Sequence, residues 1–137
     1  MRKVVVTREV FKETIDFLEA HFDVLSNQED RLLGREELLC RISDAEGIQT
    51  AGSDQVDDEF LDAAPKLRIV ANTAVGYNNI DVQACSQRGV IVTNTPGVLD
   101  ECVADYAFGL MIAACRRIGE SERYLRSGQW KAMYLKQ

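Results

Sequence analysis

The loop over residues 72–81 carries the residue types and spacing best suited to binding an anion. Its sequence is Asn-Thr-Ala-Val-Gly-Tyr-Asn-Asn-Ile-Asp. It follows a short apolar run over 67–71 that predicts a buried strand, and it ends at Asp81, a residue type that caps helices. Successive backbone N–H groups ahead of a helix can hold a carboxylate, and Gly76 permits a backbone conformation closed to other residues. The alternative is a plain strand-to-helix turn that Asp81 caps.

A second loop, residues 94–97, reads Asn-Thr-Pro-Gly and follows another apolar run over 90–93. Pro96 and Gly97 indicate a sharp turn, which also sets the angle of the helix that follows. In an open α/β sheet, ligands bind beyond the carboxyl ends of the strands. A site is therefore expected in the loops after Val6, Thr50, Ala71 and Thr93, and the loops at 72–81 and 94–97 are predicted to lie beside each other.

The sequence lacks the signatures of several other kinds of chemistry. No two of the nine glycines are separated by a single residue, so neither a G-x-G-x-x-G nucleotide motif nor a Walker A motif is present. The one histidine, His21, falls between the first predicted helix and the second predicted strand, which favours a surface or packing role. Adjacent carboxylates at 36/37 and 57/58 face apart on helices. No catalytic side chain is predicted.

The four cysteines, at positions 40, 85, 102 and 115, form no C-x-x-C pair. They are interpreted as small hydrophobic residues in a reducing cytoplasm, and no metal site is predicted. The net charge of −6 argues against nucleic acid or an anionic membrane as a partner. The longest apolar run, 102–115, is interrupted by Asp105 and is too short to span a bilayer. No signal-peptide core follows the first residues, so a cytoplasmic location is expected.

Strand and helix patterns alternate along the first two thirds of the chain. Strands are predicted over 3–7, 22–25, 47–50, 67–71 and 90–93, and helices over 35–42, over 57–64 and from Asp81 to Gly89. A further helix, capped by Thr7, carries Val10, Phe11, Ile15 and Leu18 at helical spacing. The expected fold is α/β, a flavodoxin-like parallel sheet with helices on both faces, followed by a long helix.

The long helix begins near residue 99 and is apolar nearly all round. Leu99, Val103, Tyr106, Leu110 and Met111 lie on one face, but Phe108 and Ile112 lie on the other. A helix of this kind must be covered on two sides, by its own domain and by another surface.

Three stretches of the sequence together resemble the D-isomer-specific 2-hydroxyacid dehydrogenases. They are residues 67–81, residues 88–99 (Arg-Gly-Val-Ile-Val-Thr-Asn-Thr-Pro-Gly-Val-Leu) and residues 103–105 (Val-Ala-Asp). The Val-Leu pair after the Thr-Pro-Gly turn is most similar to the glyoxylate and hydroxypyruvate reductases. The resemblance extends from residue 1 to about residue 130.

The resemblance implies an enzyme that transfers hydride between NAD(P)H and a small 2-keto acid, with the active site between two α/β domains. Residues 1–98 match the N-terminal part of the substrate domain, which a C-terminal helix of the complete enzyme rejoins. Residues 99–126 match a long crossover and dimerisation helix, and residues 127–137 match the lead-in to the nucleotide-binding domain. A homodimer through residues 99–118 is implied.

The resemblance also implies roles for particular residues. Val75 and Gly76 match the loop whose backbone N–H groups hold the substrate carboxylate, and Val75 also matches a position near the nicotinamide. Val103 matches a residue that faces the cofactor, where many relatives have threonine. Asn78 stands where the family usually has aspartate.

The family's glycine-rich nucleotide loop, substrate-polarising arginine and glutamate–histidine pair match nothing up to Gln137. The chain is therefore expected to be the N-terminal segment of such an enzyme, inactive by itself and unable to bind NAD or NADP alone. The alternative is a non-catalytic flavodoxin-like dimerisation or regulatory fragment. The substrate and the choice between NAD and NADP are left open.

Overall fold

The computed structural model describes residues 1–29 and 31–132. The chain divides into two compact units, Met1–Gly97 and Val98–Gln137. Each unit is considered by itself.

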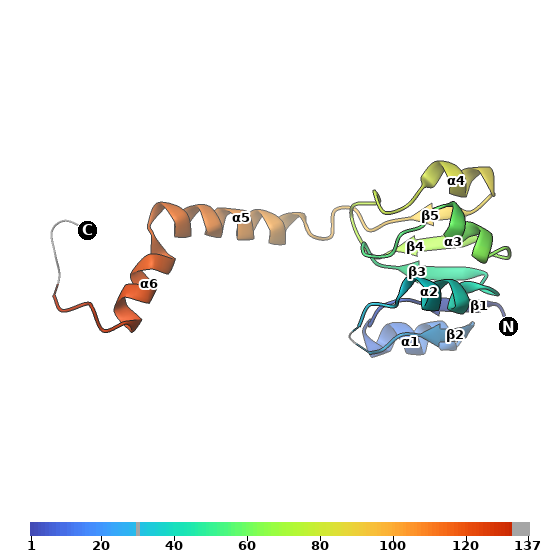
Figure 1. Ribbon diagram of the computed structural model, residues 1–137, viewed down its shortest axis with the longest axis horizontal. Coiled ribbons are helices and arrows are strands. Elements are labelled where there is room, and N and C mark those ends of the chain that lie inside the picture. The colour runs from blue at the N-terminus through green and yellow to red at the C-terminus, as the bar shows by residue number, and fades with distance from the viewer. Residues whose placement is uncertain (30, 133–137) are drawn as a thin grey trace. The chain divides into compact units, whose positions relative to one another are not determined.

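The first unit is built on a five-stranded parallel sheet (Figure 1). Its strands are β1 (Lys3–Val6), β2 (Asp23–Ser26), β3 (Gly47–Thr50), β4 (Ile69–Asn72) and β5 (Ile91–Thr93). The strand order is β2-β1-β3-β4-β5, and every neighbouring pair is parallel. Each strand is three or four residues long and rich in β-branched residues, as is typical of a buried parallel sheet. The predicted α/β fold with a parallel sheet is confirmed.

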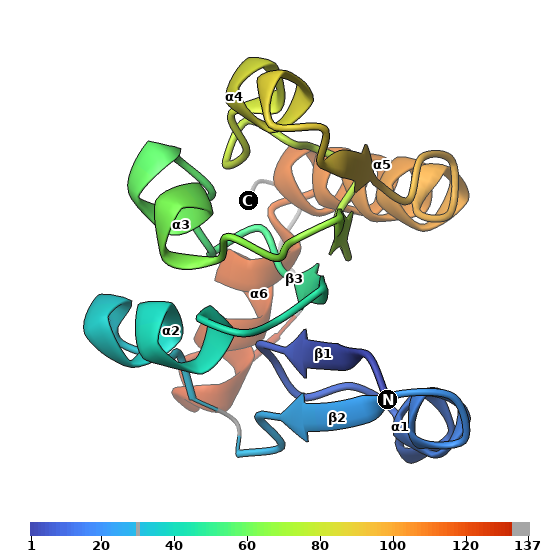
Figure 2. The same cartoon turned by 90° about the vertical axis from the view of Figure 1, so that its right-hand side faces the viewer.

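Four helices connect these strands and cover the sheet. They are α1 (Lys12–Glu19), α2 (Arg35–Ile42), α3 (Asp58–Ala63) and α4 (Val82–Gln87). Figure 2 shows α2, α3 and α4 along one face of the sheet and α1 on the opposite face. This division is the expected result of right-handed crossovers that pass on opposite sides of a parallel sheet.

The hydrophobic core lies between the sheet and the layer formed by α2, α3 and α4. Side chains from both layers are almost completely excluded from solvent, namely Val5, Ile48 and Val70 from strands and Ile42 and Phe60 from helices. The strand residues alternate in direction, so the residues next to them along each strand point to the other face.

The other face is covered only in part. Gly47, Ile69 and Ile91 lie opposite one another in register across β3, β4 and β5. Ile91 is 61% exposed and Ile69 is 37% exposed. Together with Leu18 and Phe22, these residues line an apolar groove of about 500 Å³. The first unit therefore has one complete core and one open half-face.

Over its described residues, 98–132, the second unit contains two helices rather than the single helix expected over 99–126. Helix α5 (Asp100–Cys115) ends before Arg117, which adopts a left-handed backbone conformation with φ of 51°, and α6 (Ile118–Arg126) follows. Because Arg117 turns its backbone out of the right-handed spiral, α5 cannot continue through it. No glycine or proline occupies positions 116–117, so the sequence offers no signal for this break.

The apolar surface of α5 is not covered within the second unit, since none of its 16 residues is buried. No helix among residues 1–29 and 31–132 is long and apolar enough to cross a membrane.

Local signals at helix ends predict the first unit well, with one exception. The bounds of α2 and β3 agree with the predicted ranges, and the carboxylate of Asp81 accepts a hydrogen bond from the Ala84 N–H at 2.8 Å. The cap predicted at Thr7 is wrong. Helix α1 starts five residues later, after Phe11, which is 83% exposed. Thr7 is buried and donates to Asp54 instead, because the loop after β1 meets the loop after β3.

Asp57 caps α3 and offers a test of this part of the fold. Its carboxylate accepts from the Phe60 N–H at 3.0 Å and pairs with Arg35. Burial opposes ionisation, but the Phe60 N–H and Arg35 outweigh it and lower the pKa of Asp57. Asp57→Ala is expected to reduce the free energy of unfolding by about 1–2 kcal/mol at neutral pH.

Chemical denaturation of the Asp57→Ala variant across a pH series checks this expectation. A carboxyl group whose pKa is lowered by folding stabilises the protein above its unfolded pKa of about 4, and this contribution disappears as the pH falls through the folded value. The difference between Asp57→Ala and the unaltered chain should therefore shrink in acid. Asp57→Ser, which keeps a capping oxygen, should recover part of the loss at neutral pH. Equal losses in the two variants would exclude the cap as the cause.

Candidate functional site

Two loops meet at the carboxyl ends of β4 and β5. The first comprises residues 72–81 and the second residues 94–97. They are neighbours because β4 and β5 pair in register, with Ala71 opposite Thr93. The predicted proximity of the two loops is confirmed by direct hydrogen bonds between them.

Three successive carbonyl oxygens of the first loop are tied to the ends of these strands. The Ala74 oxygen accepts from the Thr95 N–H at 3.0 Å. The Val75 oxygen accepts from the side-chain amide (Nδ2) of Asn94 at 2.9 Å. The Gly76 oxygen accepts from the side-chain amide of Asn72 at 2.9 Å. All three oxygens therefore point back toward the sheet.

The N–H groups of the same three peptides consequently point away from those anchors. A trans peptide places its C=O and N–H on opposite sides, and no cis peptide bond occurs in the part of the chain that the structure describes. The three N–H groups belong to Val75, Gly76 and Tyr77, all of which are exposed. Within the described part of the chain, none of them donates a hydrogen bond. They form a row of free donors, which is an arrangement suited to an anion.

The base of this loop is buried and well hydrogen-bonded. Asn72 is 2% exposed, and its side-chain oxygen accepts from the Thr50 hydroxyl at 3.2 Å. The Thr73 N–H donates to the Thr50 carbonyl at 2.8 Å. The loop thus leaves the sheet from a fixed point shared by β3 and β4.

A second buried network supports the end of the loop. The Asp54 carboxylate accepts from the Thr7 hydroxyl at 2.5 Å and from the Ala51 N–H at 2.8 Å. The side-chain amide of Asn79 donates to the Asp54 carbonyl at 2.9 Å, and the Val56 N–H donates to the Asn79 carbonyl. Asp54 is therefore a structural bridge between the ends of β1 and β3 and residue 79. No local sequence pattern identifies this bridge, because Thr7 and Asn79 are distant from Asp54 along the chain.

The role predicted for Gly76 from its backbone freedom is wrong. Its φ is not in the left-handed region, and an added Cβ atom would meet only the Asn78 side-chain oxygen, at 3.5 Å. Gly97 does adopt a left-handed conformation, with φ of 80°, as the predicted sharp turn requires. The two glycines therefore serve different purposes, since only Gly97 is required by backbone geometry.

The remaining candidate residues lie elsewhere. Val103 lies on α5 in the second unit and is 59% exposed. His21 is exposed beyond α1, with its Nδ1 atom 2.9 Å from the Phe17 carbonyl. No group of three or more potential metal-binding side chains gathers anywhere in residues 1–29 and 31–132.

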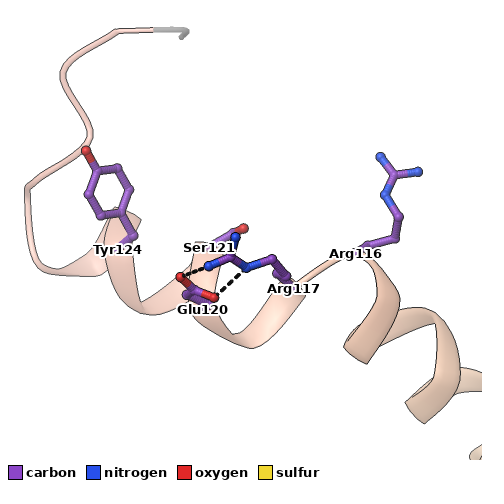
Figure 3. A pocket seen from close by; sticks show the side chains of 5 residues that line it. All are labelled: Arg116, Arg117, Glu120, Ser121 and Tyr124. Carbon is purple, nitrogen blue, oxygen red and sulfur yellow. Dashed lines mark hydrogen bonds and ion pairs between the residues drawn. The ribbon is translucent and has the colours of Figure 1, made fainter. Parts of the chain in front are cut away.

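The second unit has a shallow pocket of its own, of about 370 Å³, where α5 ends and α6 begins. Figure 3 shows the Arg117 guanidinium paired with the Glu120 carboxylate, while Arg116 points away from this pair. Arg117 donates two hydrogen bonds to the Glu120 carboxylate, and these bonds raise the pKa of Arg117. The Glu120 carboxylate already balances the charge of Arg117. We therefore interpret the lining of this pocket as an ion pair at the junction of two helices and not as an anion-binding site.

The parallel sheet and its connecting helices define an α/β domain, a class in which ligands commonly bind at the carboxyl edge of the sheet. The comparisons with known proteins identify its family. The family model "D-isomer specific 2-hydroxyacid dehydrogenase, catalytic domain" matches residues 4–129. This chain belongs to the D-isomer specific 2-hydroxyacid dehydrogenase family.

Individual relatives agree with this assignment. A glyoxylate reductase of Thermococcus kodakarensis is 46% identical over 129 residues, which cover 94% of this chain and 39% of the relative. The crystal structure of the TT0316 protein from Thermus thermophilus superposes with a TM-score of 0.88 at 35% identity, covering 98% of this chain and 43% of that one.

An NADPH-dependent glyoxylate/hydroxypyruvate reductase from Sinorhizobium meliloti is also similar. It has a TM-score of 0.73 at 32% identity, with 95% of this chain and 40% of that chain covered. The chain thus spans about two fifths of the length of its relatives.

The contrast between Gly76 and Gly97 gives a test of the loop geometry. Gly76→Ala is expected to change the free energy of unfolding by less than about 0.5 kcal/mol, because it meets neither backbone strain nor a close contact. Gly97→Ala is expected to cost about 1–2 kcal/mol, since alanine disfavours the left-handed region. Denaturation of both variants measures the difference. Equal losses would contradict the loop conformation described here.

Proposed function

We propose that this chain is the N-terminal segment of an NAD(P)-dependent 2-hydroxyacid dehydrogenase and that residues 74–77 bind the carboxylate of a small 2-keto acid. The observation that carries this proposal is the row of free N–H groups at Val75, Gly76 and Tyr77, which its fixed carbonyls orient outward. Family membership supports the substrate class, because the family acts on 2-hydroxy acids.

The chemistry of the loop suits a carboxylate. No lysine or arginine occurs over residues 72–81, so the attraction comes from peptide dipoles rather than from a charged side chain. Hydrogen bonds from N–H groups to an ionised acceptor are shorter and stronger than those between neutral groups. The missing side chain of Gly76 leaves room for the ligand, and exposed Val75 offers an apolar surface beside it. These residues would fix the acid end of a substrate and leave its 2-keto carbon free.

The residues of this chain do not fit the dinucleotide itself. The sequence has no pair of glycines separated by one residue, and the helix N-termini after β1 and β4 lack the glycine-rich turn that a pyrophosphate requires. The contribution that we propose toward NAD or NADP is limited to the apolar side chains of Val75 and Val103. Hydride transfer therefore depends on parts of the complete enzyme that have no match in this chain.

We expect the purified chain to bind a small carboxylate without reducing its keto acid. Titration with oxalate should shift the amide resonances of Val75, Gly76 and Tyr77 in ¹H–¹⁵N spectra, with a Kd on the order of 1 mM. Glyoxylate should shift the same resonances, but NADH and NADPH should not be oxidised in its presence. Chloride at equal ionic strength is the control.

The amide titration and the oxidation assay test different parts of the proposal. Absence of shifts at these three amides would contradict the carboxylate site. Measurable oxidation of NADH or NADPH would contradict the assignment of the hydride-transfer machinery to the rest of the complete enzyme.

We further propose that residues 99–118 form a homodimer contact. Within this segment, Tyr106, Phe108, Leu110, Met111 and Ile112 are each at least 45% exposed. An exposed apolar surface of this extent commonly marks an interaction site. The same surface would serve a non-catalytic dimerisation fragment, so the carboxylate experiment separates the two candidate functions.

The open half-face of the sheet also supports the interpretation as a segment. The row of Gly47, Ile69 and Ile91 lines an apolar groove. Parallel sheets are ordinarily covered on both faces. The returning C-terminal helix implied by the family resemblance is our proposed cover in the complete enzyme.

Self-association through α5 can be measured by light scattering coupled to size exclusion. The unaltered chain should elute as a dimer that dissociates on dilution. Phe108→Lys combined with Met111→Lys, one helical turn apart, should weaken the dimer at least about tenfold, because each buries a charge in the contact. Phe17→Lys removes an equally exposed aromatic residue from α1 and should have no effect. A monomer at high concentration, or equal weakening by Phe17→Lys, would refute the proposed contact.

A further inference from the structure

We propose that the side-chain amides of Asn72 and Asn94 are positioning residues that hold the carboxylate-binding N–H groups in their outward orientation. This inference rests on the proposed function of residues 74–77. Each asparagine lies at the end of a strand, one on β4 and one directly after β5, and each donates to a different carbonyl of the loop.

Asn72 is held at both ends of its side chain. Its oxygen accepts from Thr50 on β3 and its nitrogen donates to the Gly76 carbonyl. With 2% of the residue exposed, the amide has no room to rotate. Asn72 therefore fixes the peptide plane between residues 76 and 77 relative to β3 and β4. The Tyr77 N–H belongs to that plane.

Asn94 controls the preceding peptide plane. Its nitrogen donates to the Val75 carbonyl, and the neighbouring Thr95 N–H donates to the Ala74 carbonyl. The Gly76 N–H shares a plane with the Val75 carbonyl, so its direction depends on Asn94. Both anchors come from adjacent residues directly after β5.

Among the described residues, each of these two peptide planes has a single hydrogen bond that holds it, from Asn72 or from Asn94. Loss of either side-chain amide would therefore leave one plane without a hydrogen bond. Residues 75–78 are exposed, so little else restricts rotation of those peptides. A rotated plane would turn its carbonyl oxygen, instead of its N–H, toward the carboxylate, and the negative end of the peptide dipole would then face a negative charge. Asn72 and Asn94 thus determine whether the loop attracts or repels an anion.

A matched asparagine at the same sheet edge separates positioning from stability. Asn27 follows β2, is 3% exposed, and donates to the Thr7 and Arg31 carbonyls at 3.0 Å each. Asn27→Ala therefore removes comparable hydrogen bonds without touching residues 74–77. It serves as the control for Asn72→Ala and Asn94→Ala in the 137-residue chain.

Two measurements are made on each variant. The first is the oxalate Kd from the amide titration, which Asn72→Ala and Asn94→Ala should each raise about tenfold, as expected for one charge-assisted hydrogen bond. The second is the carbonyl ¹³C shift, which should change at Gly76 in Asn72→Ala and at Val75 in Asn94→Ala. Asn27→Ala should change neither quantity.

The carbonyl shifts require no ligand, so they decide the inference even if the unaltered chain fails to bind oxalate. That failure would count against the proposed function alone. Unchanged carbonyl shifts in Asn72→Ala and Asn94→Ala would overturn the positioning role. An equal rise in Kd in Asn27→Ala would also overturn it, because a general loss of stability would then explain the effect. If Asn72→Ala does not fold, the half-buried Asn94 carries the test.

Discussion

A parallel β-sheet is stable when the apolar side chains on both of its faces are buried. Most features of this chain follow from which of these side chains are buried and which are exposed. One face is sealed by α2, α3 and α4 over Ile48, Val70 and their neighbours. Among the described residues of the first unit, α1 is the helix on the opposite face, and Ile69 and Ile91 stay exposed there. The apolar side chains of helix α5 are also uncovered, because none of its residues is buried. The well-packed core gives the first unit its shape, and the uncovered surfaces are those for which we propose covering partners.

The proposed site depends on the sealed part of the fold. Short parallel strands bring the ends of β3, β4 and β5 to one edge, where buried polar groups replace apolar ones. Asn72 accepts from the Thr50 hydroxyl and donates to the Gly76 carbonyl. Asp54 accepts from the Thr7 hydroxyl and from the Ala51 N–H. Networks of this kind restrain a site, because each broken bond would leave a buried polar group unsatisfied. Among the described residues, the buried side-chain oxygens of Gln49 and Asn79 have no hydrogen-bond partner. The exposed loop is therefore held in a conformation in which its outward-pointing N–H groups stay free of hydrogen bonds to the rest of the first unit.

Much of this arrangement could be predicted from local signals. Apolar runs bounded by helix caps located the strands, and Asp81 and Gly97 adopt the cap and the turn that their residue types favour. The errors arose where the signal was long-range. Thr7 is a residue type that favours helix caps, but its hydroxyl donates to Asp54, 47 residues away along the chain. The left-handed break at Arg117 has no compositional marker, and its cost is tolerated where a bidentate pair with Glu120 stabilises the turn.

The sequence by itself determined the order of elements, the parallel sheet, the family resemblance and the two loops in which to look for a site. These properties depend on residue patterns a few positions long, because hydrophobic periodicity and turn chemistry are local. Only the tertiary structure decided why the loop over residues 74–77 is suited to an anion. The reason is that its three carbonyls are anchored by Asn72 at the end of β4 and by Asn94 and Thr95 directly after β5. The direction of a peptide plane is set by partners that folding brings together, and no pattern within the loop itself specifies it.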